Sequence, residues 1–217
     1  IGSSLRYKAI GIYSESDMAD SNVPKRPGTM AGDIKIWDAN GDGEINSLDR
    51  IRQDLTDIPQ IVYGVNLGIT WKQFDLSLLF QGQAKVINTI QETWVDPSSG
   101  GAGNLMQWWT EDMWTPENTD GTKPRLGTPN KINGTTFTNI NAAFFKLKNA
   151  EIGYTLPVAV REKIGVANAR VYLSGTNLFS FDHMRGMGID PEATGSGYGG
   201  WALNPQRLIN LGVNVSF

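Results

Sequence analysis

The feature that most constrains this chain is a period-two alternation of apolar and polar residues. In the segment 207–217, "RLINLGVNVSF", every second residue from Ile209 to Phe217 is apolar, and the residues between them are small or polar. Because successive side chains of a β-strand point to opposite faces, this pattern predicts a strand with one apolar and one polar face.

The same alternation predicts further strands along the chain. The clearest are 61–72 ("IVYGVNLGITWK"), 74–82 ("FDLSLLFQG") and 149–157 ("NAEIGYTLP"). The segment 169–179 ("ARVYLSGTNLF") is less regular, and 4–13 ("SLRYKAIGIY") is the candidate for a sixth strand. The expected fold class is therefore all-β, with antiparallel pairing.

Two architectures fit this alternation. A soluble antiparallel sheet would turn its apolar face to a core, whereas an outer-membrane barrel would turn it to lipid. The expected polar faces are rich in Gly, Asn, Ser and Thr and poor in Lys and Glu, which suits a crowded lumen. Aromatic residues also lie at the expected strand ends, as in interfacial girdles. These are Trp71, Phe74, Tyr154 and Phe217.

The connections between the expected strands alternate between short and long. The turn at 71–74 and the link 157–168 are short, whereas 14–60, 82–142 and 182–206 are long. Short turns on one side and long loops on the other are typical of outer-membrane barrels. Loops this long are unusual in a soluble domain. The sequence therefore favours a transmembrane β-barrel segment.

Composition excludes several classes of function. The chain of 217 residues carries a net charge of -3, so nothing in its charge favours nucleic acid or an anionic membrane surface as a partner. It has no Cys and one His, His183, which excludes thiol chemistry and sites built from several histidines. No apolar run approaches the about 18 residues of a transmembrane helix. The chain starts with Ile1 rather than Met, so we expect it to be an excerpt of a longer protein.

The segment 38–49, "DANGDGEINSLD", has the spacing of a calcium loop. The candidate ligands are Asp38, Asn40, Asp42, Glu44 through its backbone carbonyl, Asn46 and Asp49. Gly43 would permit the sharp turn, and Ile45 would point inward to anchor the loop. The last position is Asp rather than the usual Glu, which lowers the expected affinity or lets magnesium compete. A plain turn rich in Asp, Asn and Gly is the alternative.

Tryptophan is concentrated in the expected long loops. Trp108, Trp109 and Trp114 lie in the second loop and Trp201 in the third. Exposed rings would stack on sugars or contact a partner protein, and buried rings would pack the loop against itself. The turn-like "GIDPE" at 188–192 carries two carboxylates, a common occurrence in loops.

The order and spacing of several motifs resemble one known family. In sequence they are "GDIKIWDANGDGEINSLDR", "GVNLGITWKQFDLSLLFQG", "FFKLKNAEIGYTLP", "RVYLSGTNLFSF", "GIDPE" and "GVNVSF". Together they resemble the C-terminal part of SusC/RagA-type TonB-dependent outer-membrane transporters of the Bacteroidetes. The resemblance covers nearly the whole chain, although no single motif is diagnostic.

The resemblance implies a location, a function and a set of partners. Residues 1–217 would be one incomplete domain, the last six or so strands of a large barrel with long extracellular loops in the cell outer membrane. The calcium-type loop would lie in the first of these loops. The whole protein would import oligosaccharides or peptides with a SusD-like surface lipoprotein, energised by TonB through a missing N-terminal part. It would not be an enzyme. The alternative is a soluble calcium-binding β module of the carbohydrate-binding or dockerin type.

Overall fold

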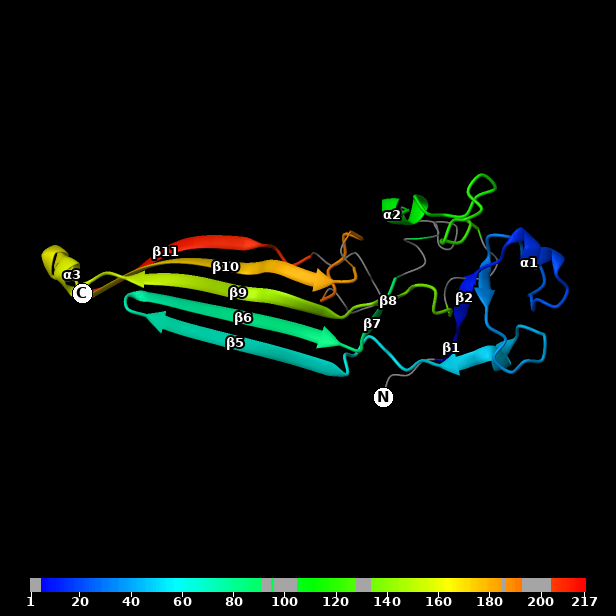
Figure 1. Ribbon diagram of the computed structural model, residues 1–217, viewed down its shortest axis with the longest axis horizontal. Helices are drawn as coiled ribbons and strands as arrows, with labels where there is room; N and C mark the ends of the chain where they lie inside the picture. The colour runs from blue at the N-terminus through cyan, green and yellow to red at the C-terminus, as the bar shows by residue number, and fades with distance from the viewer. Residues whose placement is uncertain (1–4, 91–94, 96–104, 128–133, 185, 193–203) are drawn as a thin grey trace.

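Five long strands form one antiparallel sheet in the computed structural model, which describes residues 5–90, 95, 105–127, 134–184, 186–192 and 204–217. The strand order is β11–β10–β9–β6–β5, and Figure 1 shows the strands side by side. Their bounds are β5 (Ile61–Trp71), β6 (Phe74–Ala84), β9 (Phe144–Thr155), β10 (Asn168–Asp182) and β11 (Leu208–Ser216). The sheet is open, with β5 and β11 at its two edges.

The two ends of the sheet differ in the length of their connections. At one end, β5 turns directly into β6 through Lys72, whose φ of 55° suits a tight turn. At the same end, α3 (Val158–Ile164) follows Pro157 and stops at Gly165, which adopts the left-handed conformation (φ 70°) that commonly ends helices. The long connections all lie at the other end (Figure 1), which confirms the predicted alternation.

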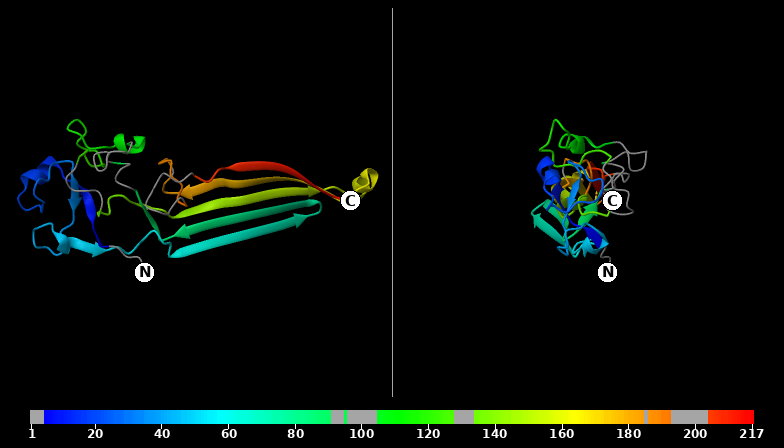
Figure 2. Two further views of the ribbon diagram at one scale, coloured as in Figure 1. Left: turned by 180° about the vertical axis from the view of Figure 1, so that it is seen from behind. Right: turned by 90° about the vertical axis from the view of Figure 1, so that its right-hand side faces the viewer.

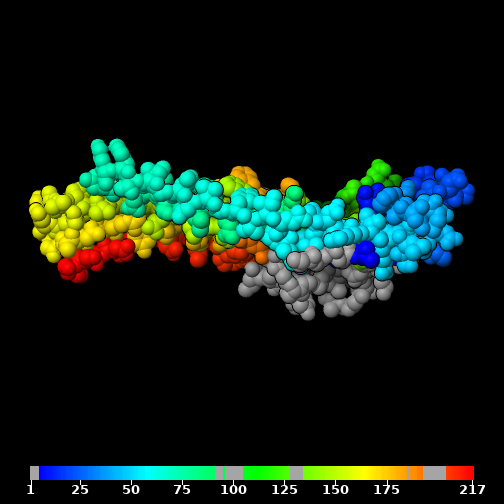
Figure 3. Space-filling view, turned by 90° about the horizontal axis from the view of Figure 1, so that it is seen from below, coloured from blue at the N-terminus to red at the C-terminus, as the bar shows by residue number. Residues whose placement is uncertain are grey.

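The long connections build a separate layer beyond the sheet, here called the loop layer (the described residues of 5–60, 85–143 and 183–207). Figures 2 and 3 show that it extends the molecule along its longest axis. It contains short elements only. These are β1 (Leu5–Tyr7), β2 (Ala9–Ile12), α1 (Glu15–Ala19), β3 (Ile34–Ile36), the 3-10 turn η1 (Ser47–Asp49), β4 (Arg50–Arg52), β7 (Ile87–Thr89), α2 (Gln107–Thr110) and β8 (Asn139–Asn141).

The segment 4–13 is the candidate for a sixth strand beside the other five, and its place in that sheet is wrong. Its described residues form β1, which pairs with β4, and β2, which pairs with β3, both within the loop layer. The reason is visible in the sequence, because the apolar positions change phase between Ala9 and Ile10. The ladder between β2 and β3 is also irregular at this point, between Ala9 and Gly11.

The buried hydrophobic cluster lies in the loop layer, and the sheet has no such core on its apolar face. Trp109, Ile34, Ile45 and Met184 belong to this cluster, and each is at least nine-tenths buried. In contrast, every described residue of β5 is exposed, and so is nearly every residue of β11. None of the helices among the described residues is long and apolar enough to cross a membrane.

Candidate functional site

The strand register gathers the apolar side chains on one face of the sheet. Residues directly opposite each other on paired strands share a face. One such row crosses all five strands and consists of Ile69, Leu76, Ile152, Leu173 and Leu211. Ile69 and Leu211 are 60% and 76% exposed, so this chain leaves its apolar face uncovered.

Aromatic rings form a belt at each end of this apolar face. Near the short turns lie Trp71, Phe74 and Tyr154, with the Phe74 and Tyr154 ring centres 4.8 Å apart. The second belt, near the loop layer, consists of Tyr63, Phe80, Phe145, Phe179 and Phe181. The sequence pattern indicated only the first belt, because the second becomes apparent only when β5, β6, β9 and β10 are aligned.

The spacing between the belts can be compared with the thickness of a membrane. Tyr154 and Phe145 are nine positions apart in β9. At about 3.3 Å per residue and a tilt of about 40°, this separation gives a height of about 23 Å. Transmembrane barrels carry an apolar band about 25 Å tall between two aromatic girdles. The outer face of the sheet therefore has the dimensions of a lipid-facing surface.

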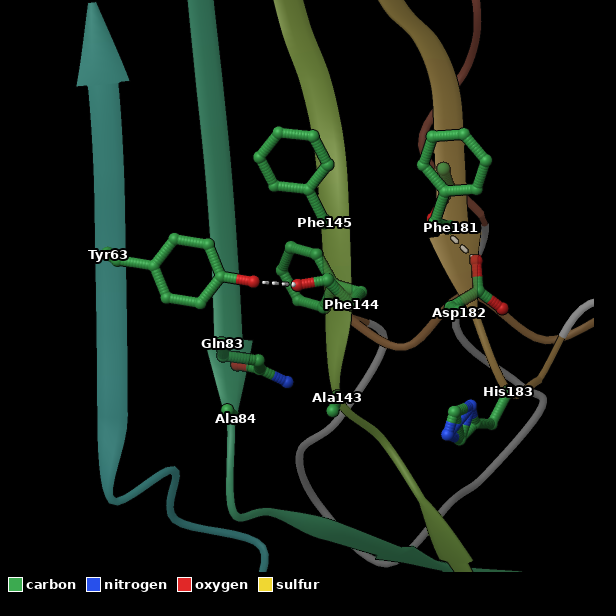
Figure 4. Close-up of a pocket in the computed structure, with 10 residues that line it drawn as sticks. Tyr63, Gln83, Ala84, Ala143, Phe144, Phe145, Phe181, Asp182 and His183 are labelled. Carbon is green, nitrogen blue, oxygen red and sulfur yellow. Dashed lines mark hydrogen bonds between the residues drawn. The ribbon is translucent and has the colours of Figure 1, made fainter.

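A pocket of about 410 Å³ lies beside the second belt. Figure 4 shows the rings of Phe145 and Phe181 along it, with His183 at its lower edge. The Tyr63 hydroxyl donates a hydrogen bond to the carbonyl of Phe144 at 3.0 Å (Figure 4). Tyr63 can lie across the sheet in this way because Gly82, its direct partner on β6, has no side chain to block the ring.

The opposite face is polar and carries an ionic bridge near the short-turn end. Arg170 on β10 donates to Asp75 on β6, with its Nε 3.0 Å from Oδ2 and a second, shorter contact from Nη2 to Oδ1. The same Nη2 donates to Glu151 on β9 at 2.7 Å. The guanidinium spans two strands because it lies over Gly153, where any side chain would overlap it.

A second ionic cluster ties the loop layer to the polar face of the sheet. Lys146 on β9 has its Nζ 2.5 Å from Asp190 and 2.8 Å from Glu192, and Lys148 reaches Glu192 at 2.8 Å. The Lys146 side chain is only 3% exposed, so the two carboxylates compensate a buried charge. We call these four residues the lysine latch.

The sequence interpretation missed the lysine latch, because it treated the carboxylates of "GIDPE" as common loop residues. The signal that would have indicated it is a pair of lysines two residues apart in the apolar segment "FFKLKN". Burial alone would raise the pKa of Glu192. Hydrogen bonds from Lys146 and Lys148 outweigh burial and hold that pKa below its usual value.

In the segment Asp38–Asp49, backbone N–H groups donate to the side-chain oxygens of several expected ligands. Asp38 accepts from Gly41 at 2.7 Å and from Gly43 at 2.8 Å, and Asp42 accepts from Glu44 at 2.9 Å. Gly43 has a φ of 85°, as expected at the sharp turn. Ile45 is buried in the cluster of the loop layer, as expected of an anchor.

The last position of the loop faces inward. Asp49 is fully buried and accepts hydrogen bonds from the backbone N–H groups of Ala39 at 2.9 Å and Asn46 at 2.7 Å. Burial raises its pKa, but these backbone hydrogen bonds outweigh burial and lower the pKa overall. Within the described ranges, no group of three or more His, Asp or Glu side chains is arranged to hold a metal ion. Calcium binding therefore stays a prediction.

The three tryptophans of the second long loop are partly or fully buried. Trp109 in α2 is 2% exposed, Trp114 is 9% exposed, and Trp108 packs against the same cluster. Trp108 and Trp109 contact each other edge to face, with ring centres 5.6 Å apart. This geometry supports loop packing, and a contact with substrate or partner stays a prediction. Trp201 lies outside the described residues.

No family model matches the chain. Two curated proteins of Formosa agariphila are similar to it over nearly its whole length. TonB-dependent receptor P3 is 30% identical over 100% of this chain, and TonB-dependent receptor P26 is 29% identical over 97%. The chain belongs to the TonB-dependent receptor family. It spans 22% of the length of each of these two receptors.

Solved structures show that this part of the receptor has a SusC/RagA-like fold. A structure of the RagAB peptide transporter matches 99% of the chain with a TM-score of 0.69 at 24% identity. The RagAB peptide importer in its open-open state matches 98% with a TM-score of 0.67 at 24% identity. The chain covers 22% of each of these structures.

The receptor fold assigns each face of the sheet to an environment. The apolar face between the aromatic belts faces lipid, and the polar face with Arg170 and the lysine latch faces the lumen. The open edges of the sheet are those of a partial barrel. The relatives are named as receptors and transporters rather than enzymes, which confirms the expectation that the chain is not an enzyme.

Proposed function

We propose that this chain forms part of the wall and part of the outer loops of a TonB-dependent importer in the cell outer membrane. The observation that carries the proposal is the uncovered apolar face between two aromatic belts, in a chain whose relatives are TonB-dependent receptors. A soluble calcium-binding β module would bury this face in its own core. We further propose that the importer takes up oligosaccharides or peptides. Its energy would come from TonB, acting through a part of the receptor outside this chain.

Uptake in cells tests the proposed transport. Cells that carry or lack the complete receptor would be given a panel of labelled oligosaccharides and peptides. Energised uptake of at least one compound should require both the receptor and TonB. If uptake of every compound were the same with and without the receptor, the importer assignment would be wrong.

We also propose that a SusD-like surface lipoprotein covers the extracellular mouth. Support comes from the likeness of the fold to the RagAB structures and from the tryptophan-rich loop at this end of the sheet. Trp108 is the ring to test, because it is less buried than Trp109 and does not sit in the centre of the cluster. Trp108→Ala should weaken co-purification of the lipoprotein, whereas Trp71→Ala, at the other end of the sheet, should not. Equal recovery with both variants would exclude a Trp108 contact.

We propose that the segment Asp38–Asp49 binds calcium, with magnesium as a competitor. Each side-chain oxygen that accepts one backbone hydrogen bond retains a further lone pair for a cation. The side chains of Asn40 and Asp42 are exposed to solvent, so an ion could reach them. Its role would be to stiffen a long extracellular loop, since ordering a loop otherwise costs conformational entropy.

A further inference from the structure

The ribbon formed by β1 and β4 places two arginines on one face. Its register pairs Tyr7 with Arg50 and Leu5 with Arg52. Residues directly opposite each other in an antiparallel pair share a face, and so do residues two positions apart in one strand. Arg50 and Arg52 therefore project from the same side of the ribbon as Tyr7. Both arginines are exposed.

A third arginine reaches the same face from a different segment. Arg26, which follows α1, has its guanidinium carbon 4.2 Å from the centre of the Tyr7 ring, and Arg50 has its own at 5.0 Å. A guanidinium stacked on a ring keeps its N–H groups directed outward in its own plane. The Tyr7 ring is buried in the hydrophobic cluster, so both guanidinium groups lie against a ring that the cluster holds in place.

Among the residues that the structure describes, Arg26, Arg50 and Arg52 have no carboxylate partner, unlike several other cations of the molecule. Lys35, Arg125 and Lys146, also in the loop layer or at its base, each lie within 2.8 Å of an Asp or Glu oxygen. Within the part of the chain that the structure describes, Arg26, Arg50 and Arg52 form no ion pair with a carboxylate. Three like charges gathered in this way repel one another unless an anion joins them.

A pocket adjoins the arginine face. Its volume is about 470 Å³, and Arg52 forms part of its wall together with Gln53, Thr56 and Gln60. Among the described residues that line it, Asp54 carries the one carboxylate, and it is not paired with Arg52. The pocket offers room for the remainder of a molecule whose charged group reaches the arginines.

We propose that Arg26, Arg50 and Arg52 bind the oxyanion groups of an imported oligomer, its carboxylates or sulfates, before the oligomer enters the lumen. Arginine forks match the geometry of such groups through two parallel N–H···O bonds. The site rests on the proposed importer function and adds to it a preference for acidic substrates. Arg26 and Arg50 contact the Tyr7 ring, and Arg52 does not. Replacing Arg52 therefore tests ligand binding without removing a contact to that ring.

The test is equilibrium binding to the complete receptor purified in detergent. The probes are an oligogalacturonate, a sulfated galactan oligosaccharide and an aspartate-rich peptide, each compared with a neutral counterpart of equal length. At least one acidic probe should bind, and Arg52→Gln should weaken it about tenfold or more, as expected for the loss of a charge-assisted pair. Lys8→Gln removes one positive charge directly after β1, where the ammonium lies over the Trp37 ring rather than Tyr7, and it should change affinity less than about twofold.

The outcomes separate the site from a structural role and from the importer function. If Arg52→Gln leaves the affinity for every acidic probe unchanged, or if none of these probes binds, the proposal is wrong. Equal losses for acidic and neutral probes would also overturn it, since they indicate a disturbed loop. Uptake in cells is measured separately. A receptor that imports a neutral oligomer but fails the binding test would therefore refute the arginine site alone.

Discussion

The guanidinium group of Arg170 lies over Gly153, and the missing side chain of that glycine is what allows the arginine to bridge strands. Asp75 is the direct partner of Gly153 on β6, and Tyr172 is its partner on β10. Arg170 thus reaches past β9 to Asp75 while also holding Glu151. One arginine therefore ties β6, β9 and β10 together on the lumenal face.

Gly153→Ala should destabilise this part of the barrel wall. A methyl group at this position overlaps the guanidinium of Arg170, so the bridge must shift or break. We expect a loss of about 1–3 kcal/mol in the free energy of unfolding, the usual cost of overpacking. Gly68→Ala is the matched control, because nothing lies within 4 Å of a methyl group there, and it should change stability by less than about 0.5 kcal/mol. If Gly153→Ala and Gly68→Ala change the free energy of unfolding equally in a denaturant-unfolding assay of the complete receptor, Gly153 is not needed to make room for Arg170.

Leu211→Arg should impair insertion into a bilayer, because Leu211 lies on the lipid-facing surface, one row inward from the belt of Trp71, Phe74 and Tyr154. A charge on this face costs about 2–4 kcal/mol at the bilayer midplane and about 0–1 kcal/mol near an interface, so the expected cost at Leu211 lies between these values. Asn210 is the neighbouring residue and faces the lumen beside Ser174, so Asn210→Arg should be tolerated better. Folding of the complete receptor into lipid vesicles measures both variants. If Leu211→Arg and Asn210→Arg are tolerated equally, Leu211 does not face lipid.

Acid should release the lysine latch. The pKa of Glu192 is lowered in the folded protein, so its contribution to stability is fully present above the ordinary value of 4.5. That contribution is lost as the pH falls through the lower folded value. Hydrogen exchange of residues 186–192, corrected for its intrinsic pH dependence, should therefore rise below pH about 4.5.

Glu192→Gln is the control for the latch, since an amide does not titrate. Exchange of residues 186–192 should already be raised at neutral pH in this variant and should respond less to acid. If exchange of the original protein stays constant from neutral pH to pH about 3, the latch does not hold the loop.

Removal of calcium should expose the segment 33–60 to proteases, if Asp38–Asp49 binds the ion. A bound ion stabilises only the folded loop, so chelation shifts the loop toward open forms and leaves the strands intact. Asp42→Ala removes a charged ligand and should have the same effect as chelation. Glu44→Ala should not, because that position is expected to contribute only its backbone carbonyl. An experimental structure determined with calcium that shows this loop ordered and no ion about 2.3–2.6 Å from its oxygens would refute the site.

Much of the sheet could be predicted from the sequence, whereas the ionic sites could not. Period two places Leu211 and Val213 on one face whatever the partner strands are, so the lipid-facing surface follows from local pattern. Lys146 and Glu192 are 46 positions apart. The two lysines in the apolar segment "FFKLKN" indicate that charges need compensation there, but nothing in that segment indicates which carboxylates provide it. The same holds for Arg170 and Asp75, which meet only through the order of the strands.

The sequence by itself determined the strand faces, the short turn at Lys72 and the uneven connections, because each depends on residues close together in the chain. It also indicated the sharp turn at Gly43 in the segment Asp38–Asp49. Only the tertiary structure decided that β1 pairs with β4 and β2 with β3, and that Arg26 and Arg50 meet on Tyr7. The physical reason is that ladder partners and cation–π contacts depend on segments far apart in the chain, whose pairing is selected by the free energy of the whole fold.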